Sequence, residues 1–297
     1  MKIGFLISKA AGKGQYADWQ KKIEAIYGKE PVMITEKEGD VFSMSKKFSR
    51  DGGDLLVLLG GDGSLSEASE ALAFSETALA IIPTGSGNDF SRNFDYDRID
   101  LENLETCPKE HIDLIEVNGK IGINILSLGF DSNSLAYTYK FNERFGKTTK
   151  LSYLYGPLAS IIKREFVDLK LDLVESSGEN LHLEGKYLIS AICNGTYYGS
   201  GFMPSPNGKI NDGILNLILI DPTSALRILS LFIAYRKGDH LGIKGVREIL
   251  IKSGKITSDK DFLYNLDGRL YSGNVLDFTI LKKALKWAYI APLKKRS

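Results

Sequence analysis

Cysteine is scarce in this sequence: Cys107 and Cys193 are the only two, and they lie far apart in no metal-ligand spacing. This excludes a disulfide-stapled secreted domain and predicts free thiols in a reducing compartment. Long apolar runs are also missing, since segment 224–235 is well short of the roughly 18 residues that span a bilayer and Arg227 interrupts it. The net charge is only +1, so composition gives no argument for a nucleic-acid partner. We therefore expect a cytoplasmic protein without a transmembrane segment, which meets any membrane substrate from the water side.

What is present indicates two domains. The 297 residues are 43% hydrophobic and 25% charged, as in a folded chain of about two domains. In residues 1–118, strand-like and helix-like segments alternate, which predicts an α/β domain with a parallel sheet covered by helices. Residues 119–283 are richer in strands, and 167–174 alternates so that one of its faces should be exposed to solvent. We expect an α/β domain followed by a β-rich, mostly antiparallel sandwich, with the boundary near 118–119.

The expected elements follow from these patterns. Strands are predicted at 3–8, 32–35, 55–59, 79–82, 121–128, 167–174, 187–193, 214–220, 249–256 and 276–281. Helices are predicted at 16–27, 41–48, 64–74, 152–163 and 225–235. The tail 282–297 is ambiguous, because Leu281, Leu285 and Ala288 have helical spacing while 288–293 also suits a last strand. Its basic end is expected to be a solvated terminus rather than a membrane contact.

The strongest local motif follows the apolar run 55–59. It reads Gly60-Gly61-Asp62-Gly63-Ser64, and a helical segment begins directly after it. Glycines let the backbone approach a ligand closely, and the unpaired N–H groups at the start of a helix favour an anion such as phosphate. Ser64 is expected to cap the helix, and Asp62 beside phosphate suggests an intervening Mg²⁺. The plainer alternative is a tight turn with a capping residue.

A second polar glycine loop follows the apolar run 79–82. Thr84, Ser86 and Asn88 supply hydroxyl and amide groups around Gly85, and Asp89 adds another carboxylate. In open α/β sheets, ligands bind just beyond the carboxyl ends of the strands. We therefore expect both glycine loops to face one cleft.

A weaker phosphate candidate is segment 9–14, which follows the first strand and would place Lys13 near phosphates. It lacks the Gly-x-x-x-x-Gly-Lys-Ser/Thr spacing, so it is not a P-loop.

These motifs resemble those of the diacylglycerol kinase catalytic-domain family, which includes bacterial soluble lipid kinases and sphingosine kinases. The motif at 60–64 matches the family's Gly-Gly-Asp-Gly-Thr, Glu67 matches a Glu shortly after it, and 83–92 matches Pro-x-Gly-Thr-x-Asn-Asp-Phe-Ala-Arg. The similarity continues in order through 112–114, Asn124, 129–130, 151–156, 194–195, 199–206, 211–215 and 237–240. The resemblance implies an NAD kinase/diacylglycerol kinase-like fold. Its α/β nucleotide-binding domain would comprise 1–118 with about 284–297, and its lipid-substrate domain 119–283.

The resemblance also implies site residues, with ATP and Mg²⁺ as cofactors. By the resemblance ATP would contact Gly60, Gly61, Asp62, Gly63, Ser64 and Glu67, and the residues themselves add Lys13, Thr84, Gly85, Ser86, Asn88 and Arg269 as expected contacts. Asp62 and Asp89 would hold Mg²⁺, and Asp212 would hold a second, structural Mg²⁺. Asp267 would be the general base and Asp113 would support it. The alternative for Asp267 is a turn residue, because Asn-Leu-Asp-Gly is a common hairpin signal.

The sequence departs from the family pattern at two places. The family opens with Asn-Pro before its first glycine loop, and this chain has Ser8-Lys9-Ala10-Ala11 there. The family's Asp-Gly-Glu is Asp267-Gly268-Arg269 here. A guanidinium at this place could neutralise phosphate charge directly, or it could mark altered or lost catalysis.

The expected acceptor is the hydroxyl of diacylglycerol or a related lipid, reached transiently at the inner face of the membrane. Aromatic side chains crowd segment 137–155 beside Arg144, Lys147 and Lys150, which suits an acyl chain and an anionic surface but equally suits a core with solvated charges. A kinase related to NAD kinase or phosphofructokinase, which share the Gly-Gly-Asp-Gly loop, is a second reading. A non-catalytic nucleotide- or lipid-binding protein, suggested by Arg269, is a third. The oligomeric state stays open, with a homodimer among the candidates.

Overall fold

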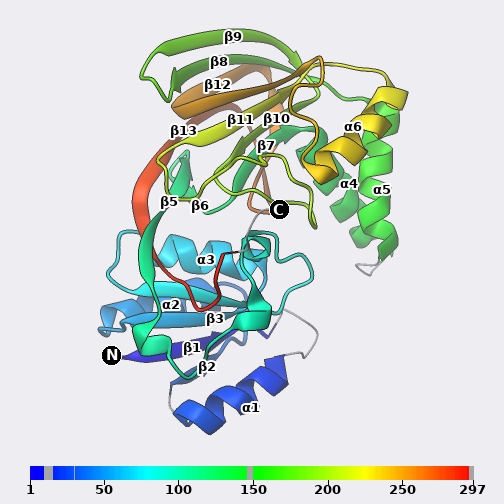
Figure 1. The fold of residues 1–297 in the computed structure, drawn as a ribbon. Coiled ribbons are helices and arrows are strands. Elements are labelled where there is room, and N and C mark those ends of the chain that lie inside the picture. The colour runs from blue at the N-terminus through cyan, green and yellow to red at the C-terminus, as the bar shows by residue number, and fades with distance from the viewer. Residues whose placement is uncertain (10–15, 30, 146–149, 294–297) are drawn as a thin grey trace.

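The computed structural model describes residues 1–9, 16–29, 31–145 and 150–293. The chain forms an N-terminal α/β half and a C-terminal β-rich half, stacked one above the other in Figure 1. The two-domain fold class predicted from the sequence is therefore confirmed. None of the helices within the described ranges is long and apolar enough to cross a membrane.

The N-terminal half is built on a parallel sheet. Its strands are β1 (Ile3–Ile7), β2 (Val32–Ile34), β3 (Leu55–Gly60) and β4 (Ala78–Pro83), in the order β4-β3-β1-β2. Its helices are α1 (Tyr16–Tyr27), α2 (Asp40–Arg50) and α3 (Asp62–Leu72). All six residues of β3 are buried, because one hydrophobic cluster lies on its α2–α3 face and another on its α1 face. This two-sided burial explains the continuous apolar run that the sequence showed.

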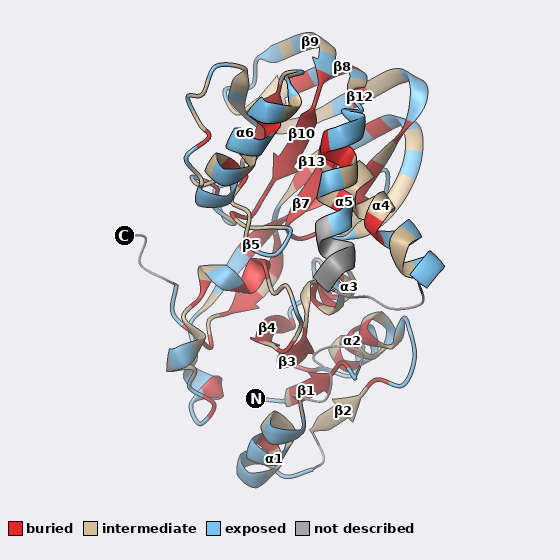
Figure 2. Ribbon diagram, turned by 90° about the vertical axis from the view of Figure 1, so that its right-hand side faces the viewer, coloured by how far each residue is buried: buried red, intermediate tan, exposed pale blue. Residues whose placement is uncertain are grey.

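The C-terminal half is mostly antiparallel. Its strands are β5 (Lys109–Val117), β6 (Lys120–Gly122), β7 (Ile125–Gly129), β8 (Val167–Glu175), β9 (Asn180–Tyr187), β10 (Ile189–Cys193), β11 (Leu215–Ile220), β12 (Val246–Leu266) and β13 (Arg269–Ala288). Helices α4 (Phe130–Phe145), α5 (Lys150–Lys163) and α6 (Ala225–Lys237) lie together on one side of it (Figure 2). A hydrophobic cluster of β7, β10, β11 and the three helices fills the space between them. Three short 3₁₀ helices, Phe90–Asn93, Tyr96–Arg98 and Leu104–Thr106, connect β4 to β5.

The strand β13 joins the two halves. It pairs with β12, then with β5, and ends in parallel pairing with β4 at Trp287 and Leu79. Trp287 is fully buried, and its ring centroid lies 5.3 Å from that of Phe90 and 5.6 Å from that of Phe94. The helical option for the start of the tail is therefore wrong, since the strand continues to Ala288.

Some elements differ from their expected ranges for local reasons. The expected strand 121–128 is two strands, because the chain turns at Ile123 and Asn124, whose amides bond to Asp267. Helix α4 was not predicted, since its sequence is rich in Ser, Asn, Thr and Tyr, which have weak helix propensity. Strands β5 and β9 were not predicted either, because charged and polar residues interrupt their apolar patterns.

Candidate active site

The two glycine loops lie against each other at one edge of the parallel sheet. Strands β3 and β4 are neighbours in register, with Gly60 opposite Pro83, and the Thr84 amide donates to the Gly60 carbonyl at 2.9 Å. A Cβ added to Gly85 would lie 2.5 Å from the Gly61 Cα, so the backbones touch where side chains would collide. The expectation that both loops face the same place is therefore confirmed.

Gly85→Ala is expected to force the two loops apart. Its Cβ would meet the Gly61 backbone and lie 2.8 Å from Asn88 Oδ1, and backbone cannot move aside as a flexible side chain can. We expect the free energy of unfolding to fall by about 1–3 kcal/mol, measured by chemical denaturation. Gly63→Ala is the matched control, because nothing lies within 4 Å of its added Cβ. Equal stability of the two variants would contradict this close packing.

Helix α3 begins at Asp62, two residues earlier than expected, and this changes the assignment of Ser64. Gly61 is the N-cap residue, and no side chain in the described part of the chain caps the helix. The Ser64 hydroxyl instead bonds to the Ser8 hydroxyl at 2.9 Å, so the expectation that Ser64 caps the helix is wrong. The first turn of α3 thus keeps backbone N–H groups available for an anion.

The second loop is closed by Asn88. Its side chain accepts from the Gly85 amide at 3.0 Å and donates to the Gly85 carbonyl at 2.7 Å, while its φ is +54°. The Asn88 amide group therefore shapes the loop from within. Thr84 is buried and its hydroxyl has no hydrogen-bond partner among the described residues, and Ser86 lines the adjoining cavity.

Two carboxylates converge beside this loop. A Cβ added to Gly87 would lie 2.8 Å from Asp62 Oδ2 and 3.8 Å from Asp89 Oδ2. Burial, and then the charge of Asp89, raise the pKa of Asp62 to about 6, with a smaller contribution from Asp267. Because a raised carboxylate pKa reflects a costly negative charge, the site as built favours a cation or a proton.

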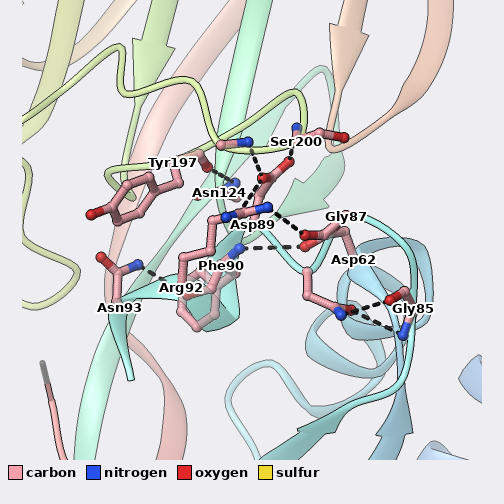
Figure 3. Close-up of polar contacts among 12 residues, drawn as sticks. Asp62, Gly85, Gly87, Asp89, Phe90, Arg92, Asn93, Asn124, Tyr197 and Ser200 are labelled. Atoms are coloured by element: carbon pink, nitrogen blue, oxygen red, sulfur yellow. Dashed lines mark hydrogen bonds and ion pairs between the residues drawn. The ribbon is translucent and has the colours of Figure 1, made fainter. Parts of the chain in front are cut away.

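Asp89 ties the glycine loop to the C-terminal half. Its carboxylate accepts from the backbone amides of Ser200 and Gly201, each at 2.8 Å, and pairs with Arg92 Nε at 3.2 Å. Figure 3 shows this carboxylate between the Arg92 side chain and the loop at Ser200. Ser200 and Gly201 were not predicted as site residues. The available sequence signal was the Gly199-Ser200-Gly201 run, which is typical of a tight loop, and all three residues have positive φ in the structure.

Asp267 occupies the turn of the β12–β13 hairpin. Asp267 and Gly268 have φ values of +48° and +90°, so the turn interpretation is correct for the backbone. Its buried carboxylate accepts from the amides of Ile123, Asn124 and Ile125 at 2.7, 3.1 and 2.9 Å. Burial raises the pKa of this carboxyl, and the three amides act against that rise. The side chain thus holds β6 and β7 to the hairpin while it lines the cavity described below.

The hydrogen bonds of the Asp113 carboxylate are with backbone amides other than those that contact Asp267. Its carboxylate accepts from the amides of Gly213 at 2.7 Å and Lys283 at 2.8 Å, and so holds the bulge where β13 bends between the halves. A route to Asp267 runs through Asn194, which donates to the carbonyls of Asp113 and Ile123 at 2.8 and 2.7 Å. The expected support of Asp267 by Asp113 stays a prediction.

A cavity of about 440 Å³ runs from the carboxylates into the C-terminal half. Asp62, Asp89 and Asp267 line its polar end, and Phe130, Leu188, Ile189, Ile228 and Leu231 are among those lining its apolar end. Within the apolar part lies Asp131, which sequence reasoning missed. Burial raises its pKa to about 7, and its Oδ2 has no hydrogen-bond partner among the described residues. The cavity therefore joins an acidic, glycine-lined end to an apolar chamber.

Comparison with known families covers both halves. Residues 2–121 match the diacylglycerol kinase catalytic domain, and residues 124–288 match the YegS C-terminal NAD kinase beta sandwich-like domain. The chain belongs to the family defined by these two domains, a diacylglycerol kinase catalytic domain followed by a YegS C-terminal domain. It is similar to proteins named "Probable lipid kinase YegS-like" from Pseudomonas aeruginosa and Klebsiella pneumoniae. Each is 28% identical over 86% of this chain, covering 83% and 84% of the relative respectively.

Solved structures of this family share the fold. A diacylglycerol kinase structure from Bacillus anthracis aligns with a TM-score of 0.69 at 19% identity, covering 97% of this chain and 96% of the other. A further Bacillus anthracis structure, of a candidate diacylglycerol kinase, aligns at 0.74 with 22% identity and the same coverage. At these identities the likeness establishes the fold.

The family's Asp-Gly-Glu motif is altered at Arg269, and the structure shows which groups the Arg269 guanidinium contacts. Its guanidinium lies 2.9 Å from Glu67 Oε1 and 3.9 Å from Glu70 Oε2, both on α3. The guanidinium expected to neutralise phosphate is thus already paired with acidic side chains. Sequence reasoning did not foresee this pairing, because the partners lie some two hundred positions apart.

Arg269→Glu is expected to destabilise the protein even though it restores the family residue. It would place a third carboxylate beside Glu67 and Glu70, so both the lost pair and the new repulsion lower the free energy of unfolding, by about 1–2 kcal/mol in total. Arg269→Gln, which loses only the pair, should cost about half as much. Thermal denaturation compares the two variants. An Arg269→Glu protein as stable as the wild type would contradict the importance of this pair.

The remaining expected site residues are less informative. Lys13 lies outside the described residues. Asp212 is exposed, its Oδ1 accepts from the Ile214 amide at 3.1 Å, and partial burial raises its pKa. Over the described ranges, no group of three or more His, Cys, Asp or Glu side chains could hold a metal by itself. Any Mg²⁺ here would therefore need ligands from water or from a phosphate, which is usual for this ion.

Proposed function

We propose that the protein is an ATP-dependent kinase that phosphorylates a hydroxyl of diacylglycerol or a related lipid, with Mg²⁺, at the cytoplasmic face of the membrane. The observation that carries the proposal is one continuous cavity, lined at its polar end by Asp62, Asp89, Asp267 and the Ser86–Gly87 part of the second loop, that extends into an apolar chamber. A phosphate donor needs the first environment and an acyl chain needs the second. The family membership supports phosphoryl transfer as the reaction class.

The residues present fit ATP and Mg²⁺. The first turn of α3, which has no side-chain cap, presents backbone amides to which phosphate oxygens can bind. Asp62 and Asp89 would hold Mg²⁺ together with water and phosphate, and the cation would offset the burial and the repulsion from Asp89 that raise the pKa of Asp62. A second Mg²⁺ at Asp212 is part of the proposal, with water as its main ligand. When bound, Mg²⁺ supplies charge neutralisation for the phosphates.

Within this site Asp267 is the proposed general base. Its Oδ2 accepts one backbone bond, from Ile123, which leaves capacity for the proton of the acceptor hydroxyl. Burial makes the carboxyl more basic than a free aspartate, while the amides of Ile123, Asn124 and Ile125 help to keep it ionised. These opposing influences suit a group that must take a proton near neutral pH. We assign nucleotide binding to 1–118 with about 284–297, and lipid binding to 119–283.

A panel of acceptors tests the proposal. Purified protein, labelled ATP and Mg²⁺ would be incubated with diacylglycerol, a sphingoid base, NAD or a sugar phosphate. We expect label in a lipid product only, and only with Mg²⁺. Label in NAD or the sugar phosphate would instead support the small-molecule kinases. Binding of nucleotide without transfer to any acceptor would support the non-catalytic alternative that the pairing of Arg269 with Glu67 favours.

A further inference from the structure

Helix α6 is apolar on two opposite faces. Ile228, Leu231 and Tyr235 are buried, while Leu226, Leu229 and Ile233 are 81%, 47% and 60% exposed. The exposed residues follow the spacing i, i+3, i+7, so they form one stripe along the helix. The helix is well formed, with Ser224 as its N-cap and Gly238 as its C-cap. Because these three side chains face solvent, they do not contribute to the hydrophobic core.

Helix α5 repeats the pattern. Tyr155, Leu158 and Ile162 are 46%, 45% and 77% exposed and follow the same i, i+3, i+7 spacing, while Ile161 is buried. Helices α5 and α6 contact each other, and Figure 2 shows both on the outside of the same face of the C-terminal half. We call these two exposed apolar stripes the α5–α6 face. Exposed apolar surface of this kind commonly marks a protein or membrane contact.

The charged residues within helices α5 and α6 are all basic. The sequence contains no Asp or Glu between Glu143 and Glu165, and none between Asp221 and Asp239. Exposed basic side chains within the described parts of these segments are Arg144, Lys163, Arg164, Arg227, Arg236 and Lys237. Cations beside exposed apolar residues are the pattern of a surface that binds anionic lipid headgroups and inserts its apolar side chains among the acyl chains. A second copy of the same face would bring like charges together, which disfavours self-association here.

The α5–α6 face also backs onto the cavity. Ile228, Leu231 and Phe232 of α6 and Pro157 of α5 line it, so the same two helices have the cavity on one side and solvent on the other. We infer that the α5–α6 face docks on an anionic lipid bilayer and presents the cavity to the membrane. The inference rests on the proposed function at one point only, which is that the lipid entering the cavity is the substrate of the kinase.

Vesicle sedimentation tests this inference with the full chain. Vesicles of equal parts phosphatidylglycerol and phosphatidylcholine would be compared with vesicles of phosphatidylcholine alone. The test variant is Leu226→Ser/Ile233→Ser, which alters exposed residues outside the cavity lining. The control is Phe74→Ser, which removes a 69% exposed apolar side chain from the N-terminal half.

We expect the wild type and Phe74→Ser to bind the anionic vesicles, and the double variant to bind them at least about tenfold more weakly. Binding to phosphatidylcholine alone should be weaker for all three. Affinity for ATP with Mg²⁺, and phosphorylation of a water-soluble short-chain diacylglycerol, should be unchanged in the double variant.

Three results would overturn the inference. They are equal vesicle binding by wild type and double variant, no binding of the wild type to anionic vesicles, and a wild-type dimer in sedimentation velocity that the double substitution dissociates. Vesicle binding needs no phosphoryl transfer. A protein that binds vesicles through this face but phosphorylates nothing would refute the proposed function and leave the docking surface intact.

Discussion

Asp62→Asn is expected to remove activity while it stabilises the fold. The pKa of Asp62 is raised to about 6 from an ordinary value near 4, so its ionised form costs folding free energy above pH 6 and not below pH 4. Asparagine keeps the oxygen that accepts from the Phe90 amide at 3.3 Å and removes the charge. At pH 8 the variant should therefore be more stable by roughly 2–3 kcal/mol. Chemical denaturation at pH 8 and at pH 4 measures this difference, which should vanish at the lower pH.

The same substitution should lower kcat/KM by about 100- to 1,000-fold, because the carboxylate proposed to hold the cation beside the transferred phosphate is lost. Initial rates with labelled ATP and a lipid acceptor measure the loss. A variant that is both stabilised and inactive would show that Asp62 is present for function at a cost to the fold. A variant that is destabilised, or that retains full activity, would remove Asp62 from the proposed site.

Asp267→Asn should abolish turnover but leave nucleotide binding intact. Loss of a general base typically lowers kcat by about 100- to 10,000-fold, while the proposed contacts to ATP lie at the glycine loops. Asparagine keeps one oxygen for the amides of Asn124 and Ile125 and loses the acceptor for Ile123. Single-turnover rates give the chemical step, and the affinity for ATP with Mg²⁺ should change by less than about threefold.

Two further measurements distinguish a catalytic role of Asp267 as general base from a purely structural role. In the wild type, kcat should decline on the acid side as the Asp267 carboxyl becomes protonated, and the raised pKa moves this limb above the range of a free aspartate. Asp267→Ala leaves three amides without their acceptor and should unfold more easily by about 2–3 kcal/mol. Full activity of the Asp267→Asn variant would contradict the role of Asp267 as general base and leave it only a structural role in the β12–β13 turn.

The parts of the site that lie close together in sequence could be predicted. The motifs at 60–64 and 84–89 each follow a buried strand, and parallel strands place their carboxyl ends at one edge, so their meeting follows from local pattern and topology. The turn at Asp267 and Gly268 also follows from a local signal, since Asp-Gly readily adopts positive φ.

The contacts between the halves could not be predicted in this way. The bonds from Ser200 and Gly201 to Asp89, and the pairing of Arg269 with Glu67, join residues more than a hundred positions apart. Single-sequence patterns report propensity and periodicity, and neither specifies which distant loop meets which. The same limit applies to Asp131, whose burial depends on how α4 packs over the cavity.

The length of the central hairpin shows a third limit. The sequence indicated strands at 249–256 and 276–281, where β12 and β13 are 21 and 20 residues long. Their remaining segments are rich in Lys, Asp, Ser and Gly, which local preference places in loops. They are strands because each pairs with several partners, β13 with β12, β5 and β4 in turn. Tertiary pairing overrides local preference here.

Isothermal titration of the protein with ATP, in the presence and absence of Mg²⁺, tests the central claim most directly. The claim is that the touching glycine loops and the carboxylates of Asp62 and Asp89 form one site for magnesium-bound nucleotide. We predict one site per chain that requires Mg²⁺, weakens as the pH falls below 6 and is lost in Asp62→Asn. Absence of binding, or binding that is indifferent to both Mg²⁺ and Asp62, would contradict it.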